Sequence, residues 1–395
     1  MIYDPRAPAV IADPHPALRR LRETEPVHKS EVLGGWVLTR YDDVKAALVD
    51  KRMSADRMRP FFEHLDPNTR ARVTELEALL KPWAVFNDPP AHGRLRAALS
   101  RAVTPATIEA MAPRIERLVA DLLDRAIARG RMDVIADFAY PLPATVVMLL
   151  LGVPLDDLER VKGWSDELAL FVGSSLGTAD KYDRAERAAR ELRARFRELV
   201  ADRRRAPRDD VLSALAHEGL SDDEVIATAV LLLFAGHETT THLIANGVLL
   251  LMRHPEEHER LSRGECSAAT AVEEILRFEP PGAAMVRVAR EAFELHGHRI
   301  ARGARIFAMI MAANRDPDHF EKADALDLGR RENRHLTFGF GSHFCIGAAL
   351  ARLEGRIALE ALGKTRPRLA VDERDLQWTD GLVLRGLRAL PVELE

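Results

Sequence analysis

Long stretches of the chain place apolar residues three or four positions apart, which is the spacing of one face of an α-helix. The clearest of these stretches predict helices over roughly 105–129, 155–175, 181–206, 221–253 and 345–364. The helix at 221–253 opens with a capping box, in which Ser221 and Glu224 satisfy free backbone N–H groups. At 1.5 Å per residue this helix would be about 50 Å long, enough to cross a whole domain.

Strand-like segments are short and few. Val27–His28, Trp36–Thr39 and Arg299–Met311 alternate apolar and polar residues or run apolar, with turn residues between them. Neither a Gly/Ser-rich linker nor a repeat nor a low-complexity block interrupts the chain. These patterns predict a single domain over residues 1–395 that is mainly α with a small β portion.

Composition and charge exclude several classes of protein. The net charge is −4, from 57 basic and 61 acidic side chains, which does not favour nucleic-acid binding. The first twenty residues carry the charges Asp4, Arg6, Asp13, Arg19 and Arg20, unlike a signal peptide or membrane anchor. The apolar stretch at 225–236 is well short of the ~20 residues of a membrane span. Two cysteines form no disulfide framework, so we expect a cytoplasmic protein, with Cys266 a loop thiol of no role.

Cys345 follows Phe338-Gly339-Phe340-Gly341-Ser342-His343-Phe344 and precedes Ile346-Gly347 and a helical run. Gly341 permits a tight turn, since glycine adopts positive φ without steric cost. Gly347 removes a side chain where a flat macrocycle would press on the backbone. The helix formers after Cys345 place its sulfur near a helix N-terminus, which favours the thiolate. The alternative is a buried structural cysteine, which does not explain the glycines and aromatic residues at fixed offsets around Cys345.

This segment resembles the cytochrome P450 family, whose signature Phe-x-x-Gly-x-x-x-Cys-x-Gly is matched by Phe338, Gly341, Cys345 and Gly347. The resemblance covers nearly the whole chain. It implies that Cys345 is the proximal iron ligand of haem b, in a mainly α fold whose long central helix lies over a buried haem.

A second match to the family lies on the long predicted helix, at Ala235-Gly236-His237-Glu238-Thr239-Thr240. It implies that Ala235 lies against the haem and that Glu238 and Thr239 deliver protons to reduced oxygen. Simple helix packing is the alternative, but a buried glutamate is costly unless it is paired or functional. A zinc site is excluded because His237 and His242 are five residues apart, about 140° off one helix face. We therefore take both histidines as ordinary helix residues.

Two weaker matches concern support and haem binding. Glu274 and Arg277, three residues apart, share a helix face, and the resemblance implies that they support the loop around Cys345. The residues that the resemblance assigns to the haem propionates are His92, Arg96, Arg287 and His343.

The substrate pocket can be placed only by family position. The resemblance implies walls from the loop Arg57–Phe86 and the segment Glu167–Lys181. It adds the single positions Leu232, Ala283, Ala284, Met285, Leu382 and Val383, beside Ala235. Most of these residues are apolar and several are small, which favours a hydrophobic substrate of moderate size.

The resemblance implies a monooxygenase that inserts one atom of O2 into an unactivated C–H bond of a hydrophobic small molecule. The chain has no flavin or iron–sulfur segment, so we expect a separate ferredoxin or flavodoxin-type donor with its reductase. The alternatives are an H2O2-driven peroxygenase and a non-catalytic haem-binding module, and Glu238 and Thr239 argue against both.

Basic residues flank the cysteine segment, and we expect an acidic electron donor to dock there. They are Arg330, Arg331, Arg334, His335, Arg352 and Arg356. We expect Arg352 to face the donor, whereas Arg356 fits a solvated helix face equally well.

Overall fold

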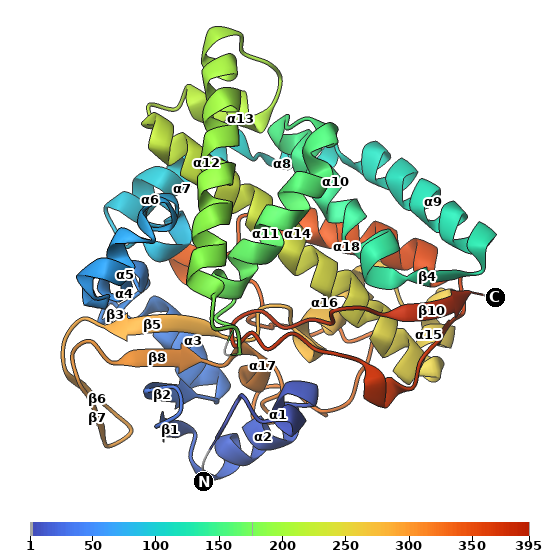
Figure 1. Ribbon diagram of the computed structural model, residues 1–395. Coiled ribbons are helices and arrows are strands. Elements are labelled where there is room, and N and C mark those ends of the chain that lie inside the picture. Colours follow the sequence, from blue (N-terminus) through green and yellow to red (C-terminus); the bar gives the residue numbers. More distant parts are fainter. Residues whose placement is uncertain (1–2, 176, 395) are drawn as a thin grey trace. The chain divides into compact units, whose positions relative to one another are not determined.

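The computed structural model describes residues 3–175 and 177–394 of the chain (Figure 1). Contacts along the chain divide it into two compact units. The first comprises Met1–Met53, Ala112–Pro143 and Glu238–Glu395, and the second comprises Ser54–Met111 and Ala144–His237. Helices dominate both units and nearly all described strands belong to the first, so the fold is mainly α with a small β portion.

A five-stranded sheet in the first unit has the strand order β1-β2-β8-β5-β3 (Figure 1). β1 and β2 form an antiparallel hairpin that turns at Gly34, whose φ of +59° favours glycine. β2 runs parallel to β8, and β8 runs antiparallel to β5. The strands are β1 (Val27–Ser30), β2 (Gly35–Leu38), β8 (Arg305–Ala308), β5 (Met285–Ala289) and β3 (Met53–Ser54).

Smaller β elements also belong to the first unit. A three-stranded antiparallel sheet has the order β4-β10-β9, and a separate hairpin pairs β6 with β7. Their bounds are β4 (Arg131–Asp133), β10 (Pro391–Leu394), β9 (Pro367–Leu369), β6 (Phe293–Leu295) and β7 (His298–Ile300).

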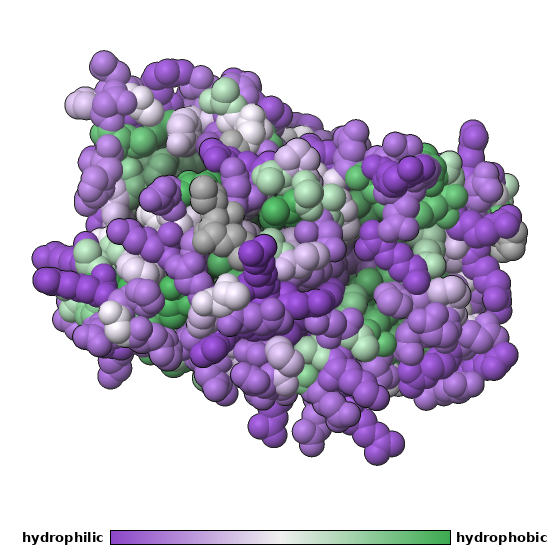
Figure 2. Space-filling model, turned by 90° about the horizontal axis from the view of Figure 1, so that it is seen from below, coloured by the Kyte–Doolittle hydropathy of each residue, from purple (hydrophilic) through white to green (hydrophobic). Residues whose placement is uncertain are grey.

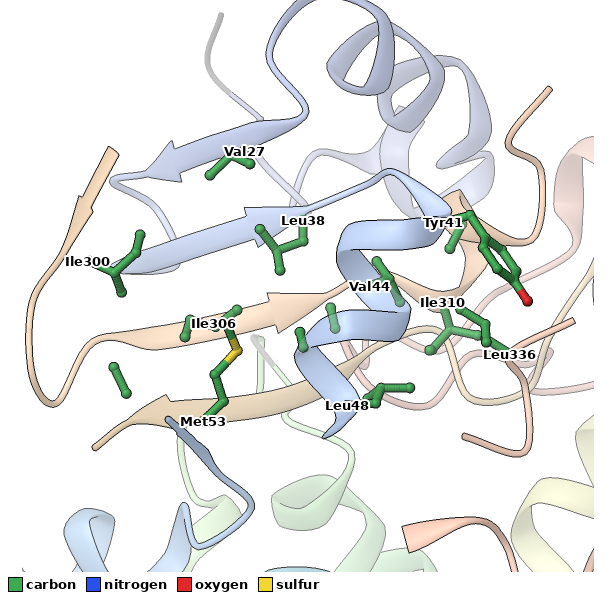
Figure 3. Packing of buried hydrophobic residues seen from close by; sticks show 14 of the residues in the cluster. Val27, Leu38, Tyr41, Val44, Leu48, Met53, Ile300, Ile306, Ile310 and Leu336 are labelled. Carbon is green, nitrogen blue, oxygen red and sulfur yellow. The ribbon is translucent and has the colours of Figure 1, made fainter. Parts of the chain in front are cut away.

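The five-stranded sheet is covered by α3 (Tyr41–Val49) in a buried cluster drawn in Figure 3. Val44 and Leu48 of this helix lie in one cluster with Leu38 of β2 and Ile306 of β8. Leu336, two residues before Phe338, is part of the same cluster. The sheet core therefore anchors the chain segment that leads into the cysteine loop.

A helical core in the first unit brings together α16 (Ala268–Phe278), α18 (Ala348–Leu362) and the C-terminal part of α14 (Asp222–Arg253). Two glycines permit the close approach of these helices. A Cβ on Gly247 would lie 3.2 Å from Ile275, and one on Gly355 would lie 3.1 Å from Val272. Because Cys345 precedes α18, this packing fixes the helix into which the cysteine loop leads.

The remaining helices are divided between the two units. In the first unit they are α1 (Pro8–Ala12), α2 (His15–Thr24), α9 (Ala112–Arg129), α15 (Pro255–Ser262) and α17 (Ile310–Ala313). In the second unit they are α4 (Met58–His64), α5 (Pro67–Ala71), α6 (Thr74–Leu80), α7 (Ala91–Ala102), α8 (Pro105–Glu109), α11 (Leu158–Val172), α12 (Lys181–Arg205) and α13 (Val211–Ala216). α10 (Pro141–Leu151) begins in the first unit and continues in the second.

α14 (Asp222–Arg253) is a single helix of 32 residues that contributes to both units, changing from the second to the first after His237. Its N-terminus has the predicted capping box. The Ser221 N–H donates to the Glu224 carboxylate at 3.0 Å, and the Glu224 N–H donates to the Ser221 hydroxyl at 3.3 Å. These two hydrogen bonds satisfy backbone N–H groups that have no partner within the helix.

The structure corrects several predicted boundaries. The helix predicted over 105–129 is two helices, α8 and α9, and the one predicted over 345–364 begins only at Ala348. The strand predicted over Arg299–Met311 is wrong in its middle and at its end. Gly303 has a φ of +82° in the turn between β7 and β8, and Ile310–Ala313 forms α17 instead of strand. Arg302-Gly303 was the turn signal available in the sequence, whereas the apolar run at 306–313 cannot be assigned to strand or helix by periodicity alone.

One apolar window, Val134–Leu151, has the length and composition of a membrane span. However, 67% of this window is buried inside the protein, as in the core helix of a soluble protein. On the face drawn in Figure 2, hydrophilic side chains predominate and hydrophobic ones form separate groups.

Candidate functional site

Cys345 lies in the loop between a short 3-10 turn (Gly341–His343) and α18. Its N–H donates to the Phe338 carbonyl at 2.8 Å, and Phe344 N–H donates to the Gly341 carbonyl at 3.0 Å. Gly341 has a φ of +75°, as the tight turn requires. Cys345 is exposed, and a Cβ on Gly347 would lie 3.9 Å from its sulfur. The loop thus presents an accessible thiol shortly before the N-terminus of α18, which begins at Ala348.

Phe338 is the link between this loop and the helical core. Its ring lies beneath the Arg352 guanidinium, 4.5 Å from the ring centre, and 5.7 Å from the His335 ring. Arg352 in turn donates two hydrogen bonds, at 2.7 and 2.8 Å, to the Glu273 carboxylate of α16. Burial would raise the pKa of Glu273, but the hydrogen bonds from Arg352 and His335 lower it to about 2. The loop is therefore supported by an ion pair between α16 and α18.

The structure brings Glu274 and Arg277 into a buried pair, with hydrogen bonds of 2.7 and 2.8 Å between them. Arg277 also donates to the carbonyls of Asn314, Ala323 and Ala325. The Glu274 carboxylate also accepts from the Asp327 N–H, Arg330 and Asn333. This network ties α16 to the segment before the cysteine loop, which a sequence spacing of three does not reveal.

The residues expected to hold propionates fall into two sets. Arg287 on β5 and His343 before Cys345 belong to the first unit, and Arg287 is 6% exposed, with Nη1 donating to the Val286 carbonyl. His92 and Arg96 lie one turn apart on α7 in the second unit. Burial, and then the Arg96 charge, lower the pKa of the His92 imidazole.

Glu238 and Thr239 lie near the middle of α14 and are both partly buried. Gly236 just before them has no room for a side chain, since a Cβ there would lie 2.9 Å from Val147 of α10. Ala235 is exposed, although its neighbours Leu233 and Phe234 are buried. An accessible position in the interior of a long buried helix is suited to contact a bound molecule.

The two histidines of α14 have different surroundings. His237 is fully buried, and its Nδ1 lies 2.6 Å from the Leu233 carbonyl of the preceding turn. His242 Nε2 instead lies 3.5 Å from the Glu238 carboxylate, a contact that the prediction of an ordinary helix residue missed. The four-residue spacing of this pair was the signal available in the sequence. Within residues 3–175 and 177–394, no group of three or more His, Cys, Asp or Glu side chains is placed to hold a metal ion.

Most positions expected to contact substrate gather in the first unit. The Ala283 N–H donates to the Val383 carbonyl at 2.9 Å. Ala283, Ala284 and Leu382 share one buried cluster, with Val383 packed against it. Met285 follows on β5, and its methyl carbon would lie 3.2 Å from a Cβ on Gly339. Met285 thus lies beside Gly339 of the cysteine loop, while Leu232 is on α14 in the second unit.

The two predicted wall segments of the second unit meet through aromatic side chains. Phe61, from the segment Arg57–Phe86, lies 5.3 Å edge-on from Phe171, from the segment Glu167–Lys181. Tyr182 is 5.9 Å from the Phe171 ring. Residue 176 of the second wall is outside the described residues. The sequence did not show that these walls pack against each other, because about 110 residues of chain separate them.

Several basic residues around the cysteine loop are already engaged in ion pairs, so they are less available to an electron donor than the sequence suggests. Arg330 is paired with buried Glu274, Arg352 and His335 with Glu273, and Arg356 with Glu360. Arg331 and Arg334 are exposed. The same surface carries two exposed aromatic rings, Phe340 and Phe344, 41% and 40% exposed, with Lys45 4.7 Å from the Phe340 ring centre.

Comparisons with known proteins agree with this arrangement. The family model for cytochrome P450 matches residues 35–264 and 268–362. The polyketide biosynthesis cytochrome P450 PksS of Bacillus subtilis is 38% identical over 100% of this chain and 99% of its own length. The 6-deoxyerythronolide B hydroxylase of Saccharopolyspora erythraea is 38% identical over 95% of this chain and 94% of its own. The crystal structure of P450BioI with a hexadec-9Z-enoic acid ligated acyl carrier protein has a TM-score of 0.90, with 34% identity, covering 98% of this chain and 99% of that one.

A mainly helical fold that presents a cysteine thiol from a glycine-framed loop defines a haem-thiolate oxygenase. The chain belongs to the cytochrome P450 family. It is a haem-dependent monooxygenase that uses O2 and electrons from a redox partner. The residues present fit this cofactor, because the first unit combines an accessible Cys345 sulfur beside the side-chain-free Gly347 with the buried cation Arg287.

Proposed function

We propose that this enzyme binds haem b through the Cys345 thiolate and hydroxylates an unactivated C–H bond of a hydrophobic small molecule. The cysteine loop carries the proposal, since its backbone hydrogen bond to Phe338 and its two flanking glycines hold an accessible sulfur before α18. Thiolate-ligated haem iron supplies the reductive activation of O2. The protein's own residues bind and orient the substrate, exclude water and supply protons.

Each group of polar residues has a distinct proposed role. His92, Arg96, Arg287 and His343 bind the two haem propionates through charge-assisted hydrogen bonds. The Glu238 carboxylate would relay protons from solvent, and the Thr239 hydroxyl would pass them on for the reduction of O2. Glu274 and Arg277 are structural, because their buried network holds the segment before the cysteine loop without reaching it.

We propose a long-chain acyl or macrolide-like substrate. The apolar cluster around Ala283, Ala284 and Leu382 supports it, together with Met285 and Val383 beside it. Similar proteins are named for polyketide biosynthesis, for biotin biosynthesis and for the hydroxylation and epoxidation of mycinamicin IV, and P450BioI was solved with a hexadec-9Z-enoic acid ligated acyl carrier protein. In the second unit, Leu232 and Ala235 of α14 and the aromatic side chains of Phe61 and Phe171 are also proposed to contact the substrate.

The electron donor is proposed to be a ferredoxin or flavodoxin-type protein with its own reductase, in the cytoplasm. Its docking surface centres on the exposed rings of Phe340 and Phe344, with Lys45, Arg331 and Arg334 as charges around them. Arg352 contributes less than its sequence position suggests, because Glu273 already neutralises it.

The test of the cysteine assignment is the absorption spectrum of the reduced protein with CO. We expect the strongly red-shifted Soret band of a thiolate-ligated haem, and we expect Cys345→His to replace it with a histidine-type band and to abolish oxygenase activity. Cys266→Ala is the matched control, since Cys266 is a buried thiol in the cluster of α16 and α18, whereas Cys345 is exposed. An unchanged spectrum in Cys345→His would overturn the assignment.

A further inference from the structure

Glu238 has a partner on its own helix that the established motif does not include. His242 lies one turn further along α14, and its Nε2 is 3.5 Å from Glu238 Oε1. The His242 side chain is 7% exposed and that of Glu238 is 17% exposed. At these exposures solvent screens the contact far less than it would screen a surface pair.

The His242 ring is held in place by Gly386 from the C-terminal segment. A Cβ at residue 386 would lie 1.8 Å from Nδ1 and 2.2 Å from Cε1 of the ring, so only glycine fits there. The segment is itself anchored, because the Thr379 N–H donates to the Gly386 carbonyl at 2.8 Å. The neighbouring Arg385 is paired with buried Glu279 at 2.9 Å. The ring therefore cannot swing toward this segment and away from Glu238.

The surroundings of the ring also select its tautomer. Nδ1 is buried and has no hydrogen-bond partner among the described residues. A proton on Nδ1 would be a buried donor without an acceptor, and the Nε2 lone pair would then face a carboxylate. Both of these costs disappear when the proton is on Nε2, which leaves Nδ1 as a buried acceptor without a partner among the described residues. His242 then directs an N–H at the Glu238 carboxylate.

We infer that His242 is a positioning residue for Glu238, which holds the carboxylate in the orientation needed for proton delivery. The inference rests on the proposed role of Glu238. A separation of 3.5 Å is longer than a full N–H···O hydrogen bond, so the contact restrains the carboxylate without immobilising it. A proton relay needs this balance, because the acid must turn between solvent and bound oxygen.

The contact can be tested without turnover, by nitrogen NMR of the haem-loaded, reduced CO complex labelled with 15N-histidine. The His242 signal is assigned by its loss in His242→Gln. We expect a ring protonated at Nε2, whose Nε2 signal shifts in Glu238→Gln while that of His258 on α15 stays unchanged. A ring protonated at Nδ1, or an Nε2 signal that does not shift in Glu238→Gln, would overturn the inference and leave the role of Glu238 intact.

The functional consequence is measured as peroxide formed per product. We expect His242→Leu to raise this ratio about five- to tenfold, or about 1–1.4 kcal/mol, which is less than a full hydrogen bond to a charged group contributes, because the contact is longer than such a bond. Substrate KM and the CO spectrum should not change. His242→Gln places an amide N–H near the former Nε2 and should restore most of the coupling. A purely structural role for His242 would not distinguish leucine from glutamine in this way.

Two comparisons separate the possible failures. If Glu238→Gln uncouples turnover but His242→Leu does not, the inference fails alone. If neither variant uncouples turnover, the proposed role of Glu238 fails as well. Should His242→Leu not load haem, Gly386→Ala provides a second test, because its methyl group displaces the ring. We expect Gly386→Ala to shift the His242 signal and to raise peroxide, and normal coupling with a displaced ring would refute the inference.

Discussion

The ion pair between Glu273 and Arg352 should stabilise the enzyme by more than an exposed pair does. Its two hydrogen bonds of 2.7 and 2.8 Å join α16 to α18. The Arg352 guanidinium lies over the ring of Phe338, and the backbone carbonyl of Phe338 accepts from the Cys345 N–H. We expect a double-mutant cycle with Glu273→Gln and Arg352→Gln to give a coupling free energy of about 1–2 kcal/mol. Exposed pairs give about 0.2–1 kcal/mol, and breaking a buried pair costs about 3–5 kcal/mol.

The intermediate value follows from the exposure of the two side chains. Glu273 is 26% exposed and Arg352 is 41% exposed, so solvent screens part of the attraction. His335 also contacts the Glu273 carboxylate, at 3.3 Å, so Glu273 keeps one partner when Arg352 is replaced. Arg352→Gln additionally loses the cation–π contact with Phe338, about 0.5–1 kcal/mol, which the cycle removes from the coupling term.

The pH dependence of the coupling has a definite sign. The pKa of Glu273 is lowered to about 2 in the folded protein, so the folded state favours the ionised carboxylate. The stabilisation is therefore complete above the ordinary glutamate pKa of about 4.3 and is lost as the pH falls toward 2. We expect the same coupling at pH 8 and pH 5, and a smaller one below pH 4.

The assay is denaturant unfolding of the haem-loaded protein, followed by both haem absorbance and circular dichroism. The matched control is the pair Arg356 and Glu360 on the exposed side of α18, 38% and 51% exposed. A cycle on that pair should give no more than about 0.5 kcal/mol. If the Glu273–Arg352 coupling is no larger than this control, the pair does not support the cysteine loop as we argue.

Three further predictions concern the proposed site. Thr239→Ala should keep substrate binding and oxygen consumption but divert electrons to peroxide, and fully coupled turnover would contradict the proton-delivery role. Arg287→Leu should weaken haem retention during purification by roughly 1.5–3 kcal/mol, the loss of one charge-assisted hydrogen bond, and unchanged retention would show that Arg287 does not bind a propionate. Met285→Ala and Leu382→Ala should change the product distribution more than the rate of haem reduction, which product analysis and stopped-flow absorbance would compare.

Local spacing determined much of what this protein is. Three features each occupy a stretch of no more than ten residues. They are Cys345 with its framing glycines, the capping box at Ser221, and the pair of Glu274 with Arg277. At such separations the geometry of one turn or one helix face dictates which groups meet. The long helix α14 is likewise a local property, because its apolar repeat and its cap are both written in consecutive residues.

The tertiary structure alone decided which distant residues become partners. Arg352 looks like a free surface cation in the sequence, but folding places Glu273, 79 residues away, against it and neutralises its charge. His242 is aimed at Glu238 because Gly386, from the far end of the chain, occupies the space on the other side of its ring. A hydrophobic pattern specifies which face of an element is buried but not which element covers it. Partner choice, and with it the electrostatics of the site, depends on that packing.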